Sequence, residues 1–307
     1  SSQYNHGCHI NSGSDYVRDL VKKWTTEFSL HDISEPDVSA EIIIAHVLGH
    51  KTLHRVDQHT TLTSSEVSQV NRLCRLRLAR MPVQYIIGEW DFHALTLKMK
   101  SPVLIPRPET EELASLCVAT LNQSEHLLNS HFLEIGVGTG AVSIYLLKML
   151  KQLQGIALDI SPHACQLTSE NAENVGVLGR LQVIKGDFNN SIVFQQLKKL
   201  GPYSLIVSNP PYVPSDEMTN LQPEIIRYED HGALDGGPEG MNLIRQIVLN
   251  AGDLLDKRGH MWLEVAPHHS LCIQNVLEES EHSRTLTLVE TVKDVFGKNR
   301  FCHLQKC

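Results

Sequence analysis

The stretch HFLEIGVGTGAVSIYLLKML, residues 131–150, decides the fold expected for this chain. HFLEI has the apolar character of a buried strand, GVGTG is a glycine-rich loop, and AVSIYLLKML has helical spacing. Glycines let the backbone approach a ligand closely, and the N-terminus of the following helix offers free N–H donors. A strand, a glycine loop and a helix in this order predict the start of an α/β sheet that binds an adenosine cofactor.

The alternation of strands and helices continues to the end of the chain. The predicted strands are residues 131–135, 155–160, 181–187, 203–209, 260–265, about 285–290 and about 300–304. We therefore expect a Rossmann-like α/β domain over 109–307, with a seven-stranded, mainly parallel sheet and helices on both faces. In such a sheet, ligands bind beyond the carboxyl ends of the strands, near the switch point.

The first part of the chain shows helical spacing instead. A second helix is marked by Ser34 as its N-cap and Gly49 as its stop, and a third by Thr63 and Glu66 as a capping box. These signals predict a small N-terminal helical-bundle domain over 14–81.

Two further segments adjoin this domain. Residues 1–13 are small and polar, and we expect them to form a flexible lead-in. VQYII (83–87) and ALTLKMK (94–100) flank a Gly-Glu-Trp-Asp turn region. This pattern predicts a β-hairpin linker over 82–108.

Charge limits the classes of partner. The formal charge of −8 opposes a protein that coats nucleic acid, so no direct DNA binding is expected. One basic stripe stands out on the third predicted helix, formed by Arg72, Arg75, Arg77 and Arg80. It is either a solvated face or a docking surface for an acidic partner or RNA.

Composition limits the cofactors and the compartment. No apolar stretch reaches the ~18 residues that span a bilayer, so no membrane association is expected. The seven cysteines form no C-x-x-C pair, which suits a reducing interior. The 17 histidines form no spaced ligand set, and no metal site is predicted.

The glycine loop alone does not identify the cofactor. Residues 136–141 satisfy the G-x-G-x-x-G/A pattern, which fits NAD and other adenosine cofactors equally. Asp159 ends the second strand, where its carboxylate can accept bonds from ribose hydroxyls. Asp187 and Phe188 close the third strand and can hold an adenine, although a helix cap and a core ring are the alternative roles.

The fourth strand ends in Asn209, Pro210, Pro211 and Tyr212, which favours a particular reaction. A planar NH₂ group conjugated to a carbonyl or ring is a poor nucleophile because its lone pair is delocalised. Asn209 offers a side-chain acceptor, Pro210 a rigid main-chain acceptor, and Tyr212 a flat face for stacking. The arrangement predicts positioning of an NH₂ group for attack on the methyl of S-adenosylmethionine, with Asn209, Pro210 and Tyr212 as catalytic residues.

These residues resemble a known group of enzymes. The glycine loop, the second-strand acid and Asn-Pro-Pro-Tyr are shared by class I methyltransferases. PVQYIIGEWDF followed by LIPRPETEEL (104–113), and PEIIRYEDHGALDGGPEGM after the tetrapeptide, resemble the HemK/PrmC family. The resemblance implies a class I methyltransferase fold and S-adenosylmethionine as the methyl donor. It also implies N5-methylation of the glutamine in the Gly-Gly-Gln motif of class I translation release factors.

The resemblance also implies roles for individual residues. The residues expected to bind the cofactor are Gly136, Val137, Gly138, Thr139, Gly140, Asp159, Asp187, Phe188 and Asn209. Asn209 to Tyr212 would hold the glutamine, and the Ile-Pro-Arg-Pro-Glu-Thr segment would line the site. Arg107, Thr110 and Glu111 receive no individual role, and interdomain hydrogen bonds and caps are their alternatives. The helical domain would grip the factor, and the long segment 213–238 would act as a lid or rim.

Three other functions remain open at this point. An adenine N6-methyltransferase of DNA or RNA would share the Asn-Pro-Pro-Tyr chemistry but would need a basic recognition surface. A non-catalytic adaptor would not need Asn209 or Asp159. A dinucleotide-linked oxidoreductase would need proton-relay residues, which are not evident.

The resemblance favours a mitochondrial location. MPVQYIIGEWDF and IPRPETEEL are closer to the animal mitochondrial members, and the absence of an initial Met allows a removed transit peptide. We expect a monomer in the mitochondrial matrix whose partner is a release factor.

Overall fold

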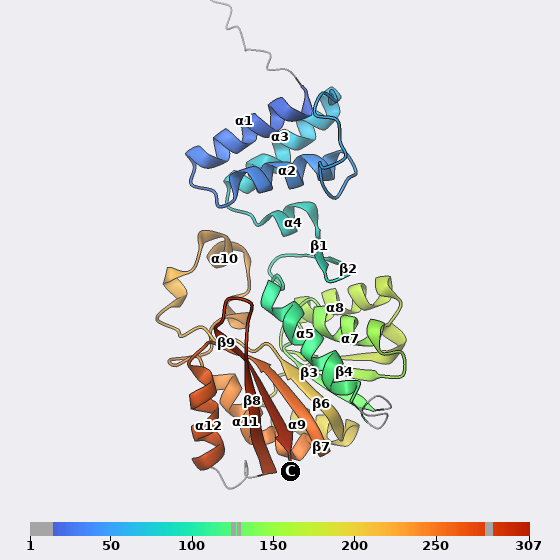
Figure 1. The fold of residues 1–307 in the computed structure, drawn as a ribbon, viewed down its shortest axis with the longest axis vertical. Coiled ribbons are helices and arrows are strands. Elements are labelled where there is room, and N and C mark those ends of the chain that lie inside the picture. Colours follow the sequence, from blue (N-terminus) through green and yellow to red (C-terminus); the bar gives the residue numbers. More distant parts are fainter. Residues whose placement is uncertain (1–14, 124–126, 128–129, 280–284) are drawn as a thin grey trace, which may run out of the picture. The chain divides into compact units, whose positions relative to one another are not determined.

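The computed structural model describes residues 15–123, 127, 130–279 and 285–307. The chain divides after Ile87 into two compact units, inside the segment 82–108 predicted as a linker. The predicted lead-in, residues 1–13, lies outside the described residues. Figure 1 shows the order of the elements along the chain.

The first unit is a helical bundle, as the sequence predicts. Its helices are α1 (Val17–Leu30), α2 (Pro36–Val47), α3 (Ser64–Leu78) and the short α4 (Val83–Ile87). Trp24, Phe28, Ile43 and Leu73 are buried together in its core. Their helical spacing places them on the inward faces of α1, α2 and α3.

The helix ends follow the sequence signals, with one exception. Glu66 and Thr63 form the predicted capping box of α3, and Gly49 follows α2 at a φ of 76°. The prediction that Ser34 caps α2 is wrong, because Glu35 is the N-cap and Pro36 is the first helical residue. Proline favours the first helical position, which places the cap directly before it.

Arg77 of α3 is a structural residue rather than part of a solvated face. Its side chain is only 4% exposed. The guanidinium donates to the hydroxyls of Ser34 and Ser39 at 3.3 Å and to the carbonyl of Met81 at 3.4 Å. These bonds join the end of α3 to the start of α2, so a serine expected to cap a helix instead accepts from an arginine.

Arg80 is also engaged in the fold. It donates to the carbonyl oxygens of His31 and Asp32, at 2.7 Å and 2.9 Å, where α1 ends. Only Arg72 and Arg75 of the predicted stripe are exposed. The four arginines therefore do not form one surface. The predictions of a solvated face and of a docking surface made by all four are both wrong.

The predicted hairpin exists, but its first strand is misplaced. VQYII forms α4, whereas the strands are β1 (Glu89–Phe92) and β2 (Leu95–Lys98). Pro82 precedes α4, and its carbonyl accepts the amide protons of Tyr85 and Ile86. Proline at a helix start outweighs the strand preference of the β-branched residues after it. The Gly-Glu-Trp-Asp region is consequently strand, and the turn lies at His93, with a φ of 51°.

The second unit contains the predicted seven-stranded sheet. Its strands are β3 (His131–Ile135), β4 (Gln154–Asp159), β5 (Leu181–Lys185), β6 (Tyr203–Ser208), β7 (Leu255–Glu264), β8 (Leu286–Lys293) and β9 (Asn299–Lys306). The order is β5-β4-β3-β6-β7-β9-β8, and β9 alone runs in the direction opposite to the other strands of this sheet. The order reverses at β3, so the carboxyl ends of β3 and β6 form the switch point.

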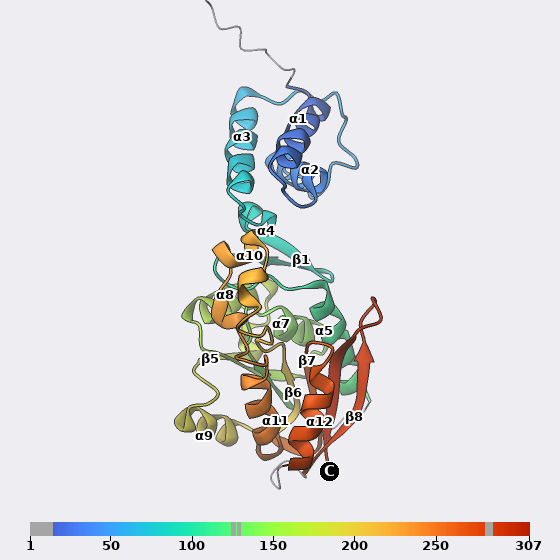
Figure 2. The same cartoon turned by 90° about the vertical axis from the view of Figure 1, so that its left-hand side faces the viewer.

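Helices cover both faces of the sheet, as Figures 1 and 2 show. One face carries α5 (Pro108–Leu121), α7 (Ala141–Met149) and α8 (Pro162–Val175). The other carries α9 (Ser191–Leu200), α11 (Asn242–Leu254) and α12 (His269–Glu279). Between β6 and α11 the chain forms a long segment that contains α10 (Pro223–Tyr228). Because both faces are covered, ligands reach the sheet only at its edge.

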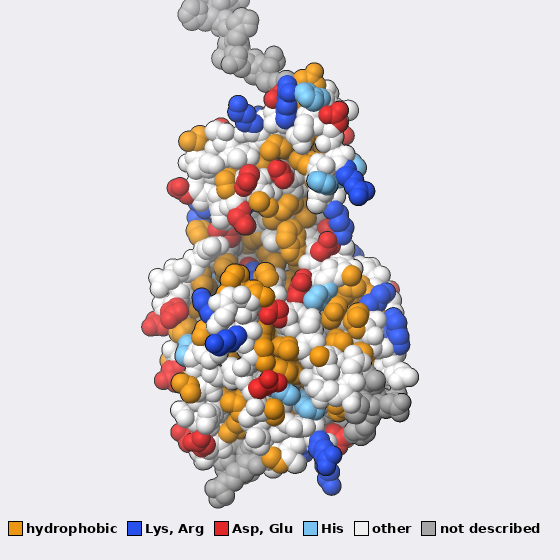
Figure 3. Space-filling view, viewed as in Figure 1, with side chains coloured by type: hydrophobic (Ala, Val, Ile, Leu, Met, Phe, Trp, Pro, Cys, Tyr) orange, Lys and Arg blue, Asp and Glu red, His pale blue; other side chains and the backbone are white. Residues whose placement is uncertain are grey.

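The distribution of charged side chains and the character of the helices bear on possible binding partners. On the face of the second unit seen in Figure 3, Lys and Arg side chains are dispersed among acidic and apolar ones. Within the described part of the chain, no helix has the length and apolar character needed to cross a membrane.

Replacing Arg77 with alanine should destabilise the first unit by about 2 kcal/mol, because two hydroxyls and a carbonyl lose a buried donor. The measurement is amide hydrogen exchange of α1 to α3, whose opening free energy should fall. Arg72→Ala removes the same charge from an exposed position and should change it little. Equal exchange in the two variants would show that the Arg77 bonds do not stabilise the bundle.

Candidate active site

A cavity of about 290 Å³ lies at the switch point of the sheet. Its volume is at the lower end of the range for small-molecule sites. The predicted site residues that line it are Gly136, Gly138, Asp159, Asp187, Phe188, Asn209 and Pro211. Residues that end four strands far apart in the sequence are thereby brought to one place.

Five predicted site residues do not line this cavity: Val137, Thr139, Gly140, Pro210 and Tyr212. The side chains of Val137 and Thr139 are buried in the fold, so these residues can serve a ligand only through their backbone.

The glycine loop is fixed by hydrogen bonds to its neighbours. The amide of Gly138 donates to Oδ2 of Asp159 at 2.9 Å, and the amide of Gly136 donates to the carbonyl of Leu158 at 2.8 Å. At the loop's start, buried Glu134 accepts from the amide of Ser143 in the first turn of α7. The loop is therefore held in shape by the protein itself.

Asp159 lies where a ribose-binding acid is expected. Its second oxygen, Oδ1, accepts from the amide of Ser161 at 2.9 Å. Burial raises the pKa of Asp159, the two backbone donors oppose that rise, and the charge of Asp230 adds to it. Asp230 itself lines the cavity, from the segment between β6 and α11, and sequence reasoning missed it. Two carboxyls at one wall suit a ligand with several hydroxyl or amino donors.

The structure decides the alternative roles that the sequence left open for Asp187 and Phe188: Asn190, not Asp187, caps α9, whereas the ring of Phe188 is part of the core. The carboxylate of Asp187 accepts from the amide of Asn189, as a local turn residue does, and Asp187 remains exposed. The ring of Phe188 is buried and packs edge-to-face on Phe194 at 5.8 Å, yet it also lines the cavity. A core ring can thus form one wall of a ligand site.

The amide of Asn209 is oriented by a helix on the same unit. Its Nδ2 donates to the hydroxyl of Thr110, at 3.2 Å, in the first turn of α5. With its nitrogen engaged there, the side chain keeps its carbonyl oxygen Oδ1 as an acceptor. Thr110 thus orients Asn209, a role that could not be predicted from the sequence.

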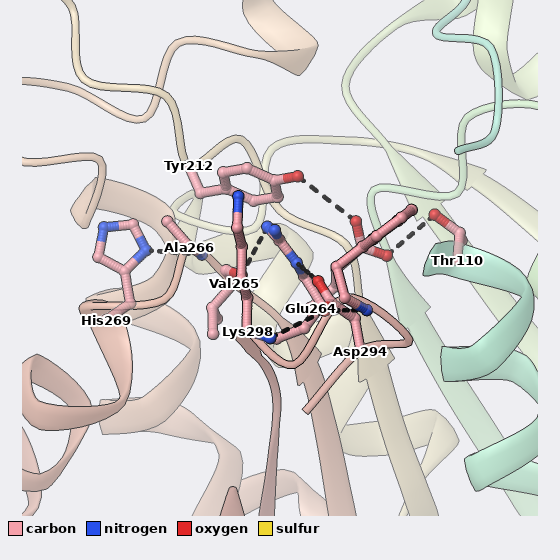
Figure 4. Close-up of polar contacts among 10 residues, drawn as sticks. Thr110, Tyr212, Glu264, Val265, Ala266, His269, Asp294 and Lys298 are labelled. Carbon is pink, nitrogen blue, oxygen red and sulfur yellow. Dashed lines mark hydrogen bonds and ion pairs between the residues drawn. The ribbon is translucent and has the colours of Figure 1, made fainter. Parts of the chain in front are cut away.

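Glu264 contacts both Tyr212, at one end of the Asn-Pro-Pro-Tyr turn, and Thr110, the partner of Asn209 at the other end; Figure 4 shows the two contacts of Glu264. It ends β7 and is only 1% exposed. Its Oε2 accepts from the hydroxyl of Thr110 at 2.9 Å, and its Oε1 is 3.5 Å from the hydroxyl of Tyr212, a weak bond. A single carboxyl therefore holds the partner of Asn209 and the ring of Tyr212.

Burial raises the pKa of Glu264 to about 7, opposed by the Thr110 bond and increased by the charge of Glu109. Burial and the nearby Glu264 also raise the pKa of Tyr212 above its usual range, so its hydroxyl remains a neutral donor. Sequence reasoning missed Glu264. The available signal was an acid at the end of an apolar strand, the same signal that identified Asp159.

Arg107 links two segments of the chain that both contribute to the wall of the cavity. Its Nη2 lies 2.9 Å from both carboxylate oxygens of Glu229, and the amide of Ile105 also donates to Glu229, at 3.3 Å. The amide of Asp230 donates to the carbonyl of Pro102 at 2.7 Å. The segment after β6 is thus bound to the chain that precedes α5, and both contribute residues to the cavity.

The Ile-Pro-Arg-Pro-Glu-Thr segment contributes in a different way from that expected. Val103 and Leu104, just before it, line the cavity. Glu111 faces away, since its Oε1 accepts from the amide of His93 and so caps the turn of the hairpin.

Two glycines allow the chain to close on the Asn-Pro-Pro-Tyr turn. A Cβ on Gly236 would lie 2.6 Å from the carbonyl oxygen of Pro211, and one on Gly240 would overlap that of Tyr212. Gly240 also has a φ of 71°. This close approach explains why LDGGPEGM follows the tetrapeptide in the sequence.

Comparison with known proteins adds independent findings. A family model described as the PrmC N-terminal domain matches residues 19–88, and one described as a methyltransferase domain matches residues 132–228.

Relatives match nearly the full chain. The human MTRF1L release factor glutamine methyltransferase is 42% identical, over 96% of this chain and 89% of its own length. The release factor glutamine methyltransferase of Thermodesulfovibrio yellowstonii is 31% identical, over 95% of this chain and 97% of its own. Among solved structures, a ribosomal protein L11 methylase from Lactobacillus delbrueckii aligns with a TM-score of 0.46 at 14% identity, covering 66% of this chain and 81% of that one.

The pKa of Glu264 predicts a pH-dependent stability. The folded state holds the proton up to about pH 7, whereas an unfolded glutamate loses it near its ordinary value of 4.5. Stability contributed by the protonated carboxyl is therefore lost as pH rises between these values. Glu264→Gln is neutral throughout, so relative to the unmodified chain it should gain on the order of 2 to 3 kcal/mol between pH 5 and pH 8.

Urea unfolding of both proteins at the two pH values measures this difference. Glu278→Gln removes a carboxyl from an exposed position on α12 and serves as the control. A difference for Glu264→Gln that stays constant with pH would show that Glu264 titrates normally.

Proposed function

The chain belongs to the family of release factor glutamine methyltransferases, and from this premise we propose its substrate. It transfers a methyl group from S-adenosylmethionine to the N5 side-chain amide nitrogen of the glutamine in the Gly-Gly-Gln motif of class I translation release factors. The observation that carries the proposal is that Asn209 lines the cavity and that its side-chain nitrogen is bound to the hydroxyl of Thr110.

The cavity residues fit S-adenosylmethionine. Asp159 offers acceptors for ribose hydroxyls, Phe188 a flat wall for the adenine, and the glycine loop a backbone that a ligand can approach closely. We propose that Asp187 and Asn209 complete this set. The cofactor supplies a methyl group on a sulfonium, which needs no activation by the protein.

The remaining work of the protein is to position the amide nitrogen. Oδ1 of Asn209 and the carbonyl oxygen of Pro210 accept the two N–H bonds of the glutamine, and the ring of Tyr212 lies against its plane. Both acceptors favour the nitrogen as it becomes tetrahedral and more acidic. The bond between the nitrogen and the methyl carbon would form as the bond between that carbon and sulfur breaks, which leaves a neutral thioether, and the nitrogen would release one proton to water as or after the new bond forms. Positioning of this kind contributes about 7 kcal/mol or more in favourable cases.

A protein substrate needs a surface as well as a cavity. We assign docking of the factor to the helical domain, 14–81, supported by the family model that covers most of it. Unchanged affinity for the factor after surface substitutions on α1 to α3 would contradict this role. We assign the rim of the substrate site to residues 213–238. Shortening this segment without changing methylation of the factor would contradict that assignment.

We also propose the oligomeric state and the location of the protein. The protein acts as a monomer in the mitochondrial matrix, and it does not bind DNA. The formal charge of −8, and the dispersion of Lys and Arg on the face of the second unit seen in Figure 3, support the absence of DNA binding. The likeness of MPVQYIIGEWDF and IPRPETEEL to the animal mitochondrial members supports the location.

The direct test incubates the full chain with labelled S-adenosylmethionine and one of three acceptors: a Gly-Gly-Gln release factor, its Gln→Ala variant, or DNA. Label should appear on the intact factor alone. Label on DNA would favour an adenine methyltransferase, and the absence of cofactor binding by calorimetry would favour a non-catalytic adaptor.

Asn209→Ala should lower kcat about 10²- to 10³-fold, because the nitrogen loses one acceptor in the transition state. The melting temperature and most of the affinity for S-adenosylmethionine should remain. Single-turnover methylation of the release factor measures the effect, and Asn275→Ala, an exposed change on α12, is the control. Near-normal turnover of Asn209→Ala would refute the positioning mechanism.

Thr110→Val should lower kcat about tenfold, since the amide of Asn209 then loses the group that orients it. Valine has nearly the same shape, so the fold should persist. Thr120→Val, on the same helix and equally buried, removes a hydroxyl bonded to Trp262 instead. If both variants lose the same activity, the effect comes from α5 in general and not from the orientation of Asn209.

A further inference from the structure

The hairpin between β8 and β9 presents two apolar side chains to solvent. Val295 is 76% exposed and Phe296 is 74% exposed. Among the described residues they are the only adjacent pair of large, exposed apolar side chains, and Phe296 is the only aromatic one among those exposed. Figure 2 shows this hairpin projecting from the second unit. Isolated apolar residues on a surface are ordinary, whereas two adjacent ones expose a continuous apolar area to solvent.

The tip is rigid because a buried carboxylate shapes it. Asp294 is buried, and its Oδ1 accepts from the amides of Phe296 and Lys298 at 3.0 Å. Its Oδ2 accepts from Nε of Arg300 at 3.2 Å. The amide of Gly297 donates to the Asp294 carbonyl at 2.9 Å. Val295 and Phe296 are thus held outward before any partner binds, which lowers the entropy cost of binding.

The tip also lies on the edge of the sheet that carries the active site. Phe301 of β9 pairs with Glu264, and β9 runs antiparallel to β7. The start of β9 is therefore beside the carboxyl end of β7. Arg300 confirms this placement, since its Nη1 donates to the carbonyl of Val265 at 3.2 Å. Glu264 in turn contacts Tyr212, so one strand end supports both the tip and the Asn-Pro-Pro-Tyr turn.

We propose that Val295 and Phe296 bind an apolar patch on the protein substrate, beside the loop that carries its glutamine. This inference rests on the proposed function. A protein that delivers a glutamine side chain to Tyr212 must bring its own surface to the same edge of the sheet. A rigid apolar pair at that edge then contacts the substrate protein, whereas a short peptide does not extend that far. The tip therefore contributes affinity for the folded factor rather than chemistry.

The test uses the full chain with Val295→Ser and Phe296→Ser together. KM for the intact release factor should rise about tenfold, and affinity for its Gln→Ala variant should fall by a similar factor. The values of kcat, the affinity for S-adenosylmethionine and the kcat/KM for a short Gly-Gly-Gln peptide should not change. Met149→Ser with Leu178→Ser is the matched control. Both residues are exposed and apolar, but they precede β4 and β5 and so lie at the amino ends of these strands, away from the active-site edge.

Each of the following results would overturn the inference. An unchanged KM for the intact factor would show that the tip does not bind it. An equal loss with the short peptide would show that the substitutions act through the active site. Loss of binding to phospholipid vesicles, with unchanged factor kinetics, would assign the tip to a membrane surface. Absence of label on the factor with the unmodified chain would instead refute the proposed function, and this inference with it.

Discussion

The side-chain amide of Asn209 offers a well-placed acceptor only while another group holds its nitrogen. Thr110 supplies that group from α5, and Glu264 holds Thr110 from the end of β7. Three elements of the second unit therefore converge on one amide. The parallel sheet is what makes this possible, because it brings the carboxyl ends of β6 and β7 to the same edge. The chemistry proposed for the enzyme depends on this chain of bonds more than on any single residue.

The cavity wall depends on a second long-range contact. Arg107 and Glu229 are separated by 122 residues, and their ion pair joins the segment after β6 to the chain before α5. Glu229 is buried and Arg107 is partly exposed, so the pair contributes little net stability, but removal of Arg107 would leave a buried carboxylate without its charged partner. We therefore interpret the pair as fixing the position of the segment after β6 relative to the chain before α5. It keeps Asp230 facing the same cavity as Asp159.

Patterns of nearby residues allowed much of the fold and site to be predicted. The strand ends and the glycine loop can be recognised from residues close together in the sequence, which is why Asp159, Phe188 and Asn209 were expected at the strand ends, where all three line the cavity. The first hairpin strand was misplaced because a proline at a helix start overrode β-branched residues. Arg77 was misread since spacing along a helix does not show what packs against it. Glu264 and Asp230 escaped notice because their roles arise from contacts with residues far away in the sequence, such as Thr110, 154 positions from Glu264.

The close approach at Gly236 and Gly240 bears on how the sequence can drift over evolution. These glycines leave no room for a side chain against the carbonyl groups of Pro211 and Tyr212. A substitution there would displace the turn that presents the acceptors, while the sheet and its core would remain. Loss of activity would then precede loss of the fold. A lineage that no longer needed the reaction could keep the stable fold and acquire a different chemistry at the same edge.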